Sequence, residues 1–379
     1  TTISTARLGF ANSISCIIVA LIAPVLGAIA DIGTLKKKFL MFFACIGIVM
    51  TLSLYLISEG NWITAMLVYI IATLGFSGGN IFYDALITLV ASKKKMDCVS
   101  ALGYSLGYLG GGILFAFNVW MTVCPKTFGF SHASEAIRFS YLTVGIWWAV
   151  FSVPLFLFVK EEKHYKKCNG NTIKGGLIQL KETFKEIRRL KTIFLFLLAY
   201  WFYMDGVDTI VRMAVDYGIS IGFKANDLII ALLITQFVGF PSALVFGYLG
   251  GKIGTKNSIY IAIFVHLVIS IWGAFIRSKT EFYVLAGVVG LVLGGIQALS
   301  RSYYAKIIPM DKSAEYFGFY NMIGKFSAVI GPSLIGGIGL FIKKIGYSAN
   351  IASRVSIMSI ALLFITGGIL LYCAKAEKE

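Results

Sequence analysis

Charged residues are scarce in this chain: Asp, Glu, Lys and Arg make up only 14% of its 379 residues. Soluble domains carry about 25%. Its six cysteines lack the spacing of a metal or redox site. The phosphate-binding pattern Gly-x-x-x-x-Gly-Lys-[Ser/Thr] is absent, and no nucleophile–base pair is visible. These absences argue against a soluble domain, an ATP-driven pump and an enzyme, and we expect no cofactor and no metal.

Apolar residues dominate instead, with 58% hydrophobic residues and a mean hydropathy of +0.82. A membrane-spanning helix needs about 20 apolar residues. The apolar runs therefore predict a polytopic, all-helical membrane protein with eleven spans. These are near 8–31, 38–58, 62–90, 98–122, 137–159, 193–216, 227–250, 257–277, 281–308, 315–341 and 350–374.

The formal charge of +16 comes from lysines that cluster in alternate loops. Lys36–Lys38, Lys93–Lys95, the segment 160–191 and the C-terminus all fall on one side of the predicted membrane. Such a bias marks the cytoplasmic side. The charge therefore indicates membrane topology and not a nucleic-acid partner.

One loop is present in two copies. Residues 27–38 (GAIADIGTLKKK) end one apolar run with a glycine, an acid and a basic cluster, and residues 247–256 (GYLGGKIGTK) repeat the pattern with Gly251 in place of the acid. The alternative is an ordinary basic loop. Asp31 could stabilise a neighbouring helix N-terminus through its dipole, so we treat it as a gating residue. The repeat predicts a duplication, in which 62–159 would superpose on 281–374.

The duplication divides the chain into an N-terminal bundle (1–159), a cytoplasmic linker (160–192) and a C-terminal bundle (193–379). The linker carries an apolar helical face with basic residues elsewhere on it. It is predicted to be an amphipathic helix on the inner leaflet; a packing strut between the bundles is an equal alternative.

A polar stripe marks the span 193–216. Trp201, Asp205, Asp208 and Arg212 follow one another at i, i+4, i+7 and i+11 and share one helical face. Ionisable residues in a span are costly and tend to be functional. Asp208 and Arg212, one turn apart, could form an ion pair, which leaves Asp205, beside Gly206, as the candidate carrier of a coupling proton. A purely structural ion pair is the alternative.

Other spans also carry polar faces. Asn80 and Asp84 share a face in 62–90, and Gln297 and Arg301 share one in 281–308. Asp84 and Arg301 lie at comparable depth near the cytoplasm, so we consider a gating pair. Lys325 is an alternative partner of Asp84 or a contact for an anionic substrate.

Several stretches together resemble one known family. They are Ala11–Ser15, Tyr104–Gly112, Asp205–Ile210, Gly294–Ser302, Gly318–Tyr320 and Gly324–Pro332. With the repeated loop, they are similar to the vacuolar-effluxer-like branch of the major facilitator superfamily. The resemblance implies two six-helix bundles and transport of small solutes. It also implies a helix before Thr1 that this chain lacks; a genuine eleven-helix protein is the alternative.

From these observations we expect a secondary active transporter that works by alternating access. Its substrate is expected to be a small polar solute, with amino acids as the first candidate. An organic anion such as a siderophore is the second candidate, because of Arg212, Arg301 and Lys325. A non-transporting receptor on the same fold is the third. We expect a monomer in the bacterial inner membrane, or the vacuolar membrane of a eukaryote, with protons as the candidate coupling ion.

Overall fold

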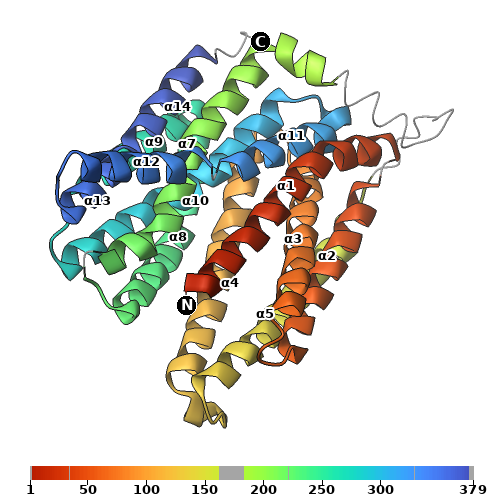
Figure 1. The fold of residues 1–379 in the computed structure, drawn as a ribbon. Coiled ribbons are helices and arrows are strands. Elements are labelled where there is room, and N and C mark those ends of the chain that lie inside the picture. Colours follow the sequence, from red (N-terminus) through yellow and green to blue (C-terminus); the bar gives the residue numbers. More distant parts are fainter. Residues whose placement is uncertain (1, 34, 162–182, 221, 328, 375–379) are drawn as a thin grey trace. The chain divides into compact units, whose positions relative to one another are not determined.

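The computed structural model describes residues 2–33, 35–161, 183–220, 222–327 and 329–374. Within these ranges the regular elements are all helices (Figure 1). Eleven segments are long and apolar enough to cross a membrane, and they follow the predicted spans in order. The prediction of an all-helical membrane protein with eleven spans is therefore confirmed.

The chain begins with α1 (Thr2–Gly33), α2 (Lys36–Ser53), α3 (Trp62–Val90), α4 (Met96–Val123) and α5 (Ala133–Phe158). It continues with α7 (Lys191–Ser220), α8 (Ala225–Ile253), α9 (Thr255–Gly273), α10 (Lys279–Ile307), α11 (Ser313–Phe326), α12 (Ile330–Lys344), α13 (Ala349–Met358) and α14 (Ala361–Cys373). Short 3₁₀ turns are η1 (Leu54–Leu56), η2 (Pro125–Phe128) and η3 (Met310–Lys312). Of the predicted amphipathic linker helix, residues 183–189 are helical, with Ile187 buried and Phe184 exposed; residues 162–182 lie outside the described ranges.

The helices form two compact units, each assembled from separate stretches of chain. The first consists of Thr1–Val90, Ile113–Phe184 and Ile308–Lys325; the second consists of Ala91–Gly112, Lys185–Ile307 and Phe326–Glu379. In the first, α3 packs on α1 and α2; in the second, α10 packs on α8 and α9, and α14 packs on α7. The division into sequence halves at 159 and 193 remains a prediction.

Two glycines bring α1 and α11 together within the first unit. A Cβ atom on Gly27 would lie 2.2 Å from the carbonyl oxygen of Ala314, and one on Gly318 would lie 2.7 Å from that of Ala23. Small residues are the usual device for close helix contact in lipid, where hydrophobic burial does not drive association. The first copy of the repeated loop, which begins at Gly27, therefore lies beside the start of α11.

The tenth predicted span, 315–341, is not one continuous helix. It divides into α11, which ends at Phe326, and α12, which begins at Ile330. Pro332 gives the reason: its ring clashes with the carbonyl four residues earlier and it has no N–H to donate, whereas both defects are tolerated in the first turn of a new helix. The last span, predicted as 350–374, is also divided, into α13 and α14, with Ser359 and Ile360 between them.

Candidate functional site

The polar face of α7 binds the break between α11 and α12. Trp201 donates its Nε1–H to the carbonyl oxygen of Phe326 at 3.1 Å, and Asp208 accepts a hydrogen bond from the Ser327 hydroxyl at 3.0 Å. Asp205 accepts from the backbone N–H groups of Ile330 and Gly331 at 2.9 and 2.8 Å. All of these residues belong to the second unit. Three of the four predicted stripe residues thus hold one interrupted helix.

Asp205 acts as the missing cap of α12. The cap residue itself is Val329, which offers no side-chain acceptor to the first turn. The buried carboxylate of Asp205 supplies one from α7, and Thr209 donates a further hydrogen bond to it at 3.2 Å. A helix N-terminus carries unsatisfied N–H groups and partial positive charge. A carboxylate at that position stabilises the second half of the broken span.

Gly331 is required for this geometry. A Cβ atom at Gly331 would fall 1.9 Å from the Thr209 hydroxyl oxygen and 2.7 Å from a carboxylate oxygen of Asp205. Only a glycine lets the backbone N–H approach the acid so closely.

One detail of the sequence interpretation is wrong. Among the described residues Asp208 and Arg212 form no ion pair: Arg212 is exposed, and Asp208 accepts a hydrogen bond from Ser327. Gly206 lies within α7, which runs without interruption from Lys191 to Ser220. It is buried, and a Cβ there would meet the ring of Phe364 at 2.7 Å, so its small size serves helix packing. The interruption lies in the opposing span.

The predicted polar residues of α10 contact the first half of α4, within the second unit. Gln297 accepts a hydrogen bond from the Tyr108 hydroxyl at 3.0 Å. Arg301 is buried, donates to the side chain and backbone of Ser100 at 3.0 Å each, and lies with its guanidinium 4.6 Å from the ring centre of Tyr104. Arg301 is thus anchored by neutral groups on α4.

Three of the predicted site residues, Asn80, Asp84 and Lys325, belong to the first unit. Asp84 is buried and accepts a hydrogen bond from the Asn321 amide at 3.2 Å. Asn80 lines a cavity of about 170 Å³ with residues of α2 and α5, and Lys325 is half-buried at the end of α11. Asp84 belongs to the first unit and Arg301 to the second, and a gating pair of the two remains a prediction.

Sequence reasoning missed another buried acid, Asp97, in the first turn of α4. Its carboxylate receives the Lys306 ammonium at 2.7 Å and the Thr255 hydroxyl at 2.9 Å, and Ser302 also donates to it. Thr255 lies near the end of the second copy of the repeated loop, whose own acid is replaced by Gly251. Another helix therefore supplies the carboxylate that the second loop lacks.

Asp31, in the first copy, contacts a helix N-terminus as expected. It accepts from the backbone N–H groups of Ala314 and Glu315 at 3.2 and 2.8 Å, at the start of α11. Lys36 pairs with it at 2.9 Å and donates to the Ser313 hydroxyl at 2.7 Å. Asp31 and Lys36 are both buried. The role of Asp31 in gating remains a prediction.

The buried contacts of Lys36 predict that two nearby lysines, Lys36 and Lys38, contribute differently to stability. Lys36→Gln should lower the free energy of unfolding by about 2 kcal/mol, because it removes a hydrogen-bonded charge from a buried carboxylate. Lys38→Gln should have an effect near zero, since Lys38 is exposed. Thermal unfolding of both purified variants measures the difference. Equal melting temperatures would show that the buried pair contributes nothing to stability.

The model of the family described as "Vacuole effluxer Atg22 like" matches residues 4–97 and 91–379. The chain is 36% identical over 376 residues to "Uncharacterized MFS-type transporter YxiO" of Bacillus subtilis, covering 99% of this chain and 86% of the relative. It is 23% identical over 361 residues to "Autophagy-related protein 22" of Saccharomyces cerevisiae, covering 79% of this chain and 66% of the relative.

A solved structure shows the same fold. The proton:xylose symporter XylE superposes with a TM-score of 0.71 at 12% identity, covering 98% of this chain and 86% of that one. At this identity the similarity shows the architecture alone, which is that of the major facilitator superfamily.

Proposed function

Because the chain belongs to the vacuole effluxer Atg22-like family of the major facilitator superfamily, we propose that it moves small zwitterionic metabolites, amino acids first, by alternating access. It is a multi-pass membrane transporter by family and fold. The observation that carries the mechanism is the contact of Asp205 with the break between α11 and α12. The B. subtilis relative supports a bacterial inner membrane as its location.

Asp205 is our candidate for the proton carrier. Its carboxylate oxygens accept two N–H groups at the start of α12, and hydrogen bonds to an ionised acceptor are about twice as strong as neutral ones. Adding a proton to Asp205 would remove the charge and occupy one of the oxygens. Proton binding would therefore weaken the attachment of α12 to α7. In this way a proton could bias the conformations through which the solute passes.

Other polar residues are proposed to serve the solute and the gate. Gln297 offers its amide N–H groups, since Tyr108 binds only its oxygen, and Trp201 offers the face of its ring. Asp84 and Arg301 are buried charges of the kind that mark transport pathways. Arg212 is exposed and makes no ion pair with Asp208, which favours an organic anion as the second candidate substrate.

Transport by purified protein in liposomes tests the proposal. We expect uptake or release of labelled amino acids that responds to an imposed pH gradient and exceeds that of empty liposomes. A parallel series with labelled carboxylic acids examines the second candidate. If neither class moves in either direction, with or without the gradient, the proposed function is wrong.

A further inference from the structure

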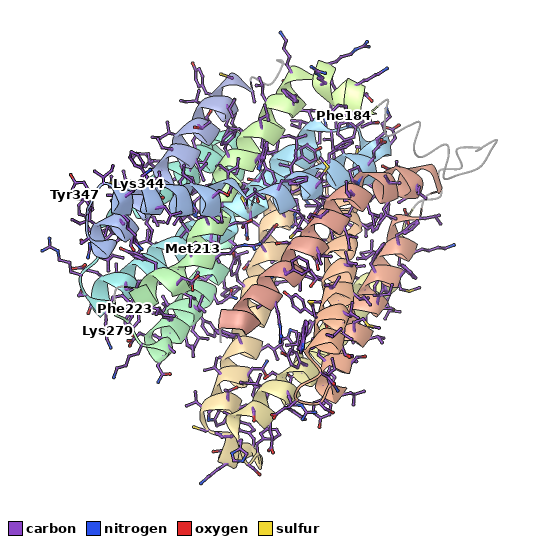
Figure 2. The ribbon with its side chains drawn as sticks, in the orientation of Figure 1. Phe184, Met213, Phe223, Lys279, Lys344 and Tyr347 are labelled. Atoms are coloured by element: carbon purple, nitrogen blue, oxygen red, sulfur yellow. The ribbon has the colours of Figure 1, made fainter. Side chains whose placement is uncertain are left out.

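A cavity of about 360 Å³ lies between α7, α12 and α13, within the second unit. It is distinct from the residues that bind the helix break. Its lining comes from the last turns of α7, the second half of α12, and α13 from Ala352 to Ile357. Figure 2 labels two markers of this region, Met213 on α7 and Lys344 at the end of α12. By helix order, these ends lie on the side of the membrane opposite the lysine-rich loops.

Two opposite charges line this cavity without forming an ion pair with each other. They are Asp216 on α7 and Lys343 on α12, both exposed. Among the described residues neither side chain has a hydrogen-bond or ion-pair partner. A carboxylate and an ammonium that share one cavity but leave each other free are complementary to the two charges of a zwitterion.

The remaining surface is mainly apolar. Tyr217, whose hydroxyl is held by the carbonyl oxygen of Gly273, contributes its ring, and Leu340 and Ile357 add aliphatic surface. Gly336 leaves room on the α12 side, because a Cβ atom there would meet no other atom within 4 Å. The volume lies in the range of small-molecule sites, about 300–1,000 Å³, which are typically apolar with a few polar groups.

We propose that this cavity binds an amphipathic zwitterion, with its ammonium at Asp216, its anionic group at Lys343 and its apolar part against Tyr217 and Leu340. This chemistry has two sources: a free amino acid with an apolar side chain, or the headgroup of a zwitterionic phospholipid. The proposal does not depend on which solute is transported, because binding here needs no transport cycle.

Two neighbouring glycines of α12 give a matched pair of variants. Gly336 lines the cavity and Gly337 does not, yet a Cβ atom at either position meets nothing within 4 Å. Gly336→Leu should fill the cavity, whereas Gly337→Leu adds the same side chain outside it. Both changes also remove a helical glycine, which favours the helix by a similar amount.

Calorimetric titration of the purified protein provides the measurement. The probes are L-phenylalanine, its amide without the carboxylate, and its N-acetyl derivative without the ammonium. Dihexanoyl phosphatidylethanolamine represents the lipid source, with dihexanoyl phosphatidylglycerol as its anionic control. We expect a zwitterionic probe to bind the wild type and the Gly337→Leu variant but not the Gly336→Leu variant. Which zwitterion binds identifies the source.

Charge variants keep the test decisive if the Gly336→Leu protein fails to fold. Asp216→Asn and Lys343→Gln, both at exposed positions, should each weaken zwitterion binding by about tenfold, the factor expected for losing one hydrogen bond to a charged group. Any one of four results would overturn the proposal. Two concern the variants: zwitterion binding that Gly336→Leu leaves unchanged, or affinity that is unchanged in both charge variants. The other two concern the probes: singly charged probes that bind as well as the zwitterion, or no binding of any probe.

Discussion

Asp205→Asn is expected to abolish proton-driven accumulation of the substrate while exchange down a concentration gradient continues. The asparagine oxygen can still accept an N–H from the start of α12, but the side chain cannot take up a proton. One proton moving down a gradient of one pH unit releases about 1.4 kcal/mol, enough for about tenfold accumulation of a solute. The variant should therefore show an accumulation ratio near one in liposomes where the wild type responds to the gradient.

Asp208→Asn is the matched control. It makes the same substitution one turn further along the same face, where the asparagine oxygen can keep the hydrogen bond from Ser327. This variant should still accumulate substrate. If Asp205→Asn responds fully to the gradient, Asp205 is not the carrier, and the coupling site must lie elsewhere in the protein.

Asp97→Ala is expected to cause the largest loss of stability. The buried carboxylate of Asp97 binds the Lys306 ammonium and accepts two hydroxyl groups, so its removal leaves a partly buried ammonium without its counter-charge. Removing one partner of a buried pair costs about 3 kcal/mol. The melting temperature of the purified variant measures this loss.

A second substitution separates the ion pair from other effects of Asp97. In a double-mutant cycle, Lys306→Gln should recover part of the stability lost in Asp97→Ala, because the uncompensated charge is then gone. Lys94→Gln, an exposed change in the preceding loop, should have no effect. Additive losses from Asp97→Ala and Lys306→Gln would show that the two charges do not stabilise one another.

The membrane spans and the Asp31 contact could be predicted from sequence because their signals are local. Apolar runs of sufficient length must be buried in lipid, and Asp31 lies in a loop whose glycines and lysines indicate a close helix contact. The break between α11 and α12 was not predicted, although Pro332 lies in the first turn of α12. A proline in a span either bends or ends a helix, and the choice depends on what supports the freed N–H groups.

The missed contacts involve partners that leave no sequence pattern. Helical spacing correctly grouped Trp201, Asp205 and Asp208, but Trp201 and Asp205 bind backbone atoms of a distant segment, and backbone has no residue signature. Asp97 lies 158 residues from Thr255 and 209 from Lys306. The one available signal was the missing acid at Gly251. The residue that makes room for the carboxylate of Asp97 is the neighbouring Gly250, where a Cβ atom would lie 3.1 Å from it.

Hydrogen exchange at the start of α12 tests the central claim most directly, namely that Asp205 on α7 holds the broken span. Exchange of the backbone amides of Ile330 and Gly331 would be followed by mass spectrometry in the wild type and in Asp205→Ala, at the same pH and in the same lipid. The account predicts that these two amides are protected in the wild type and exchange at least about tenfold faster in the variant, which loses both hydrogen bonds. Equal exchange rates in the two proteins would contradict it.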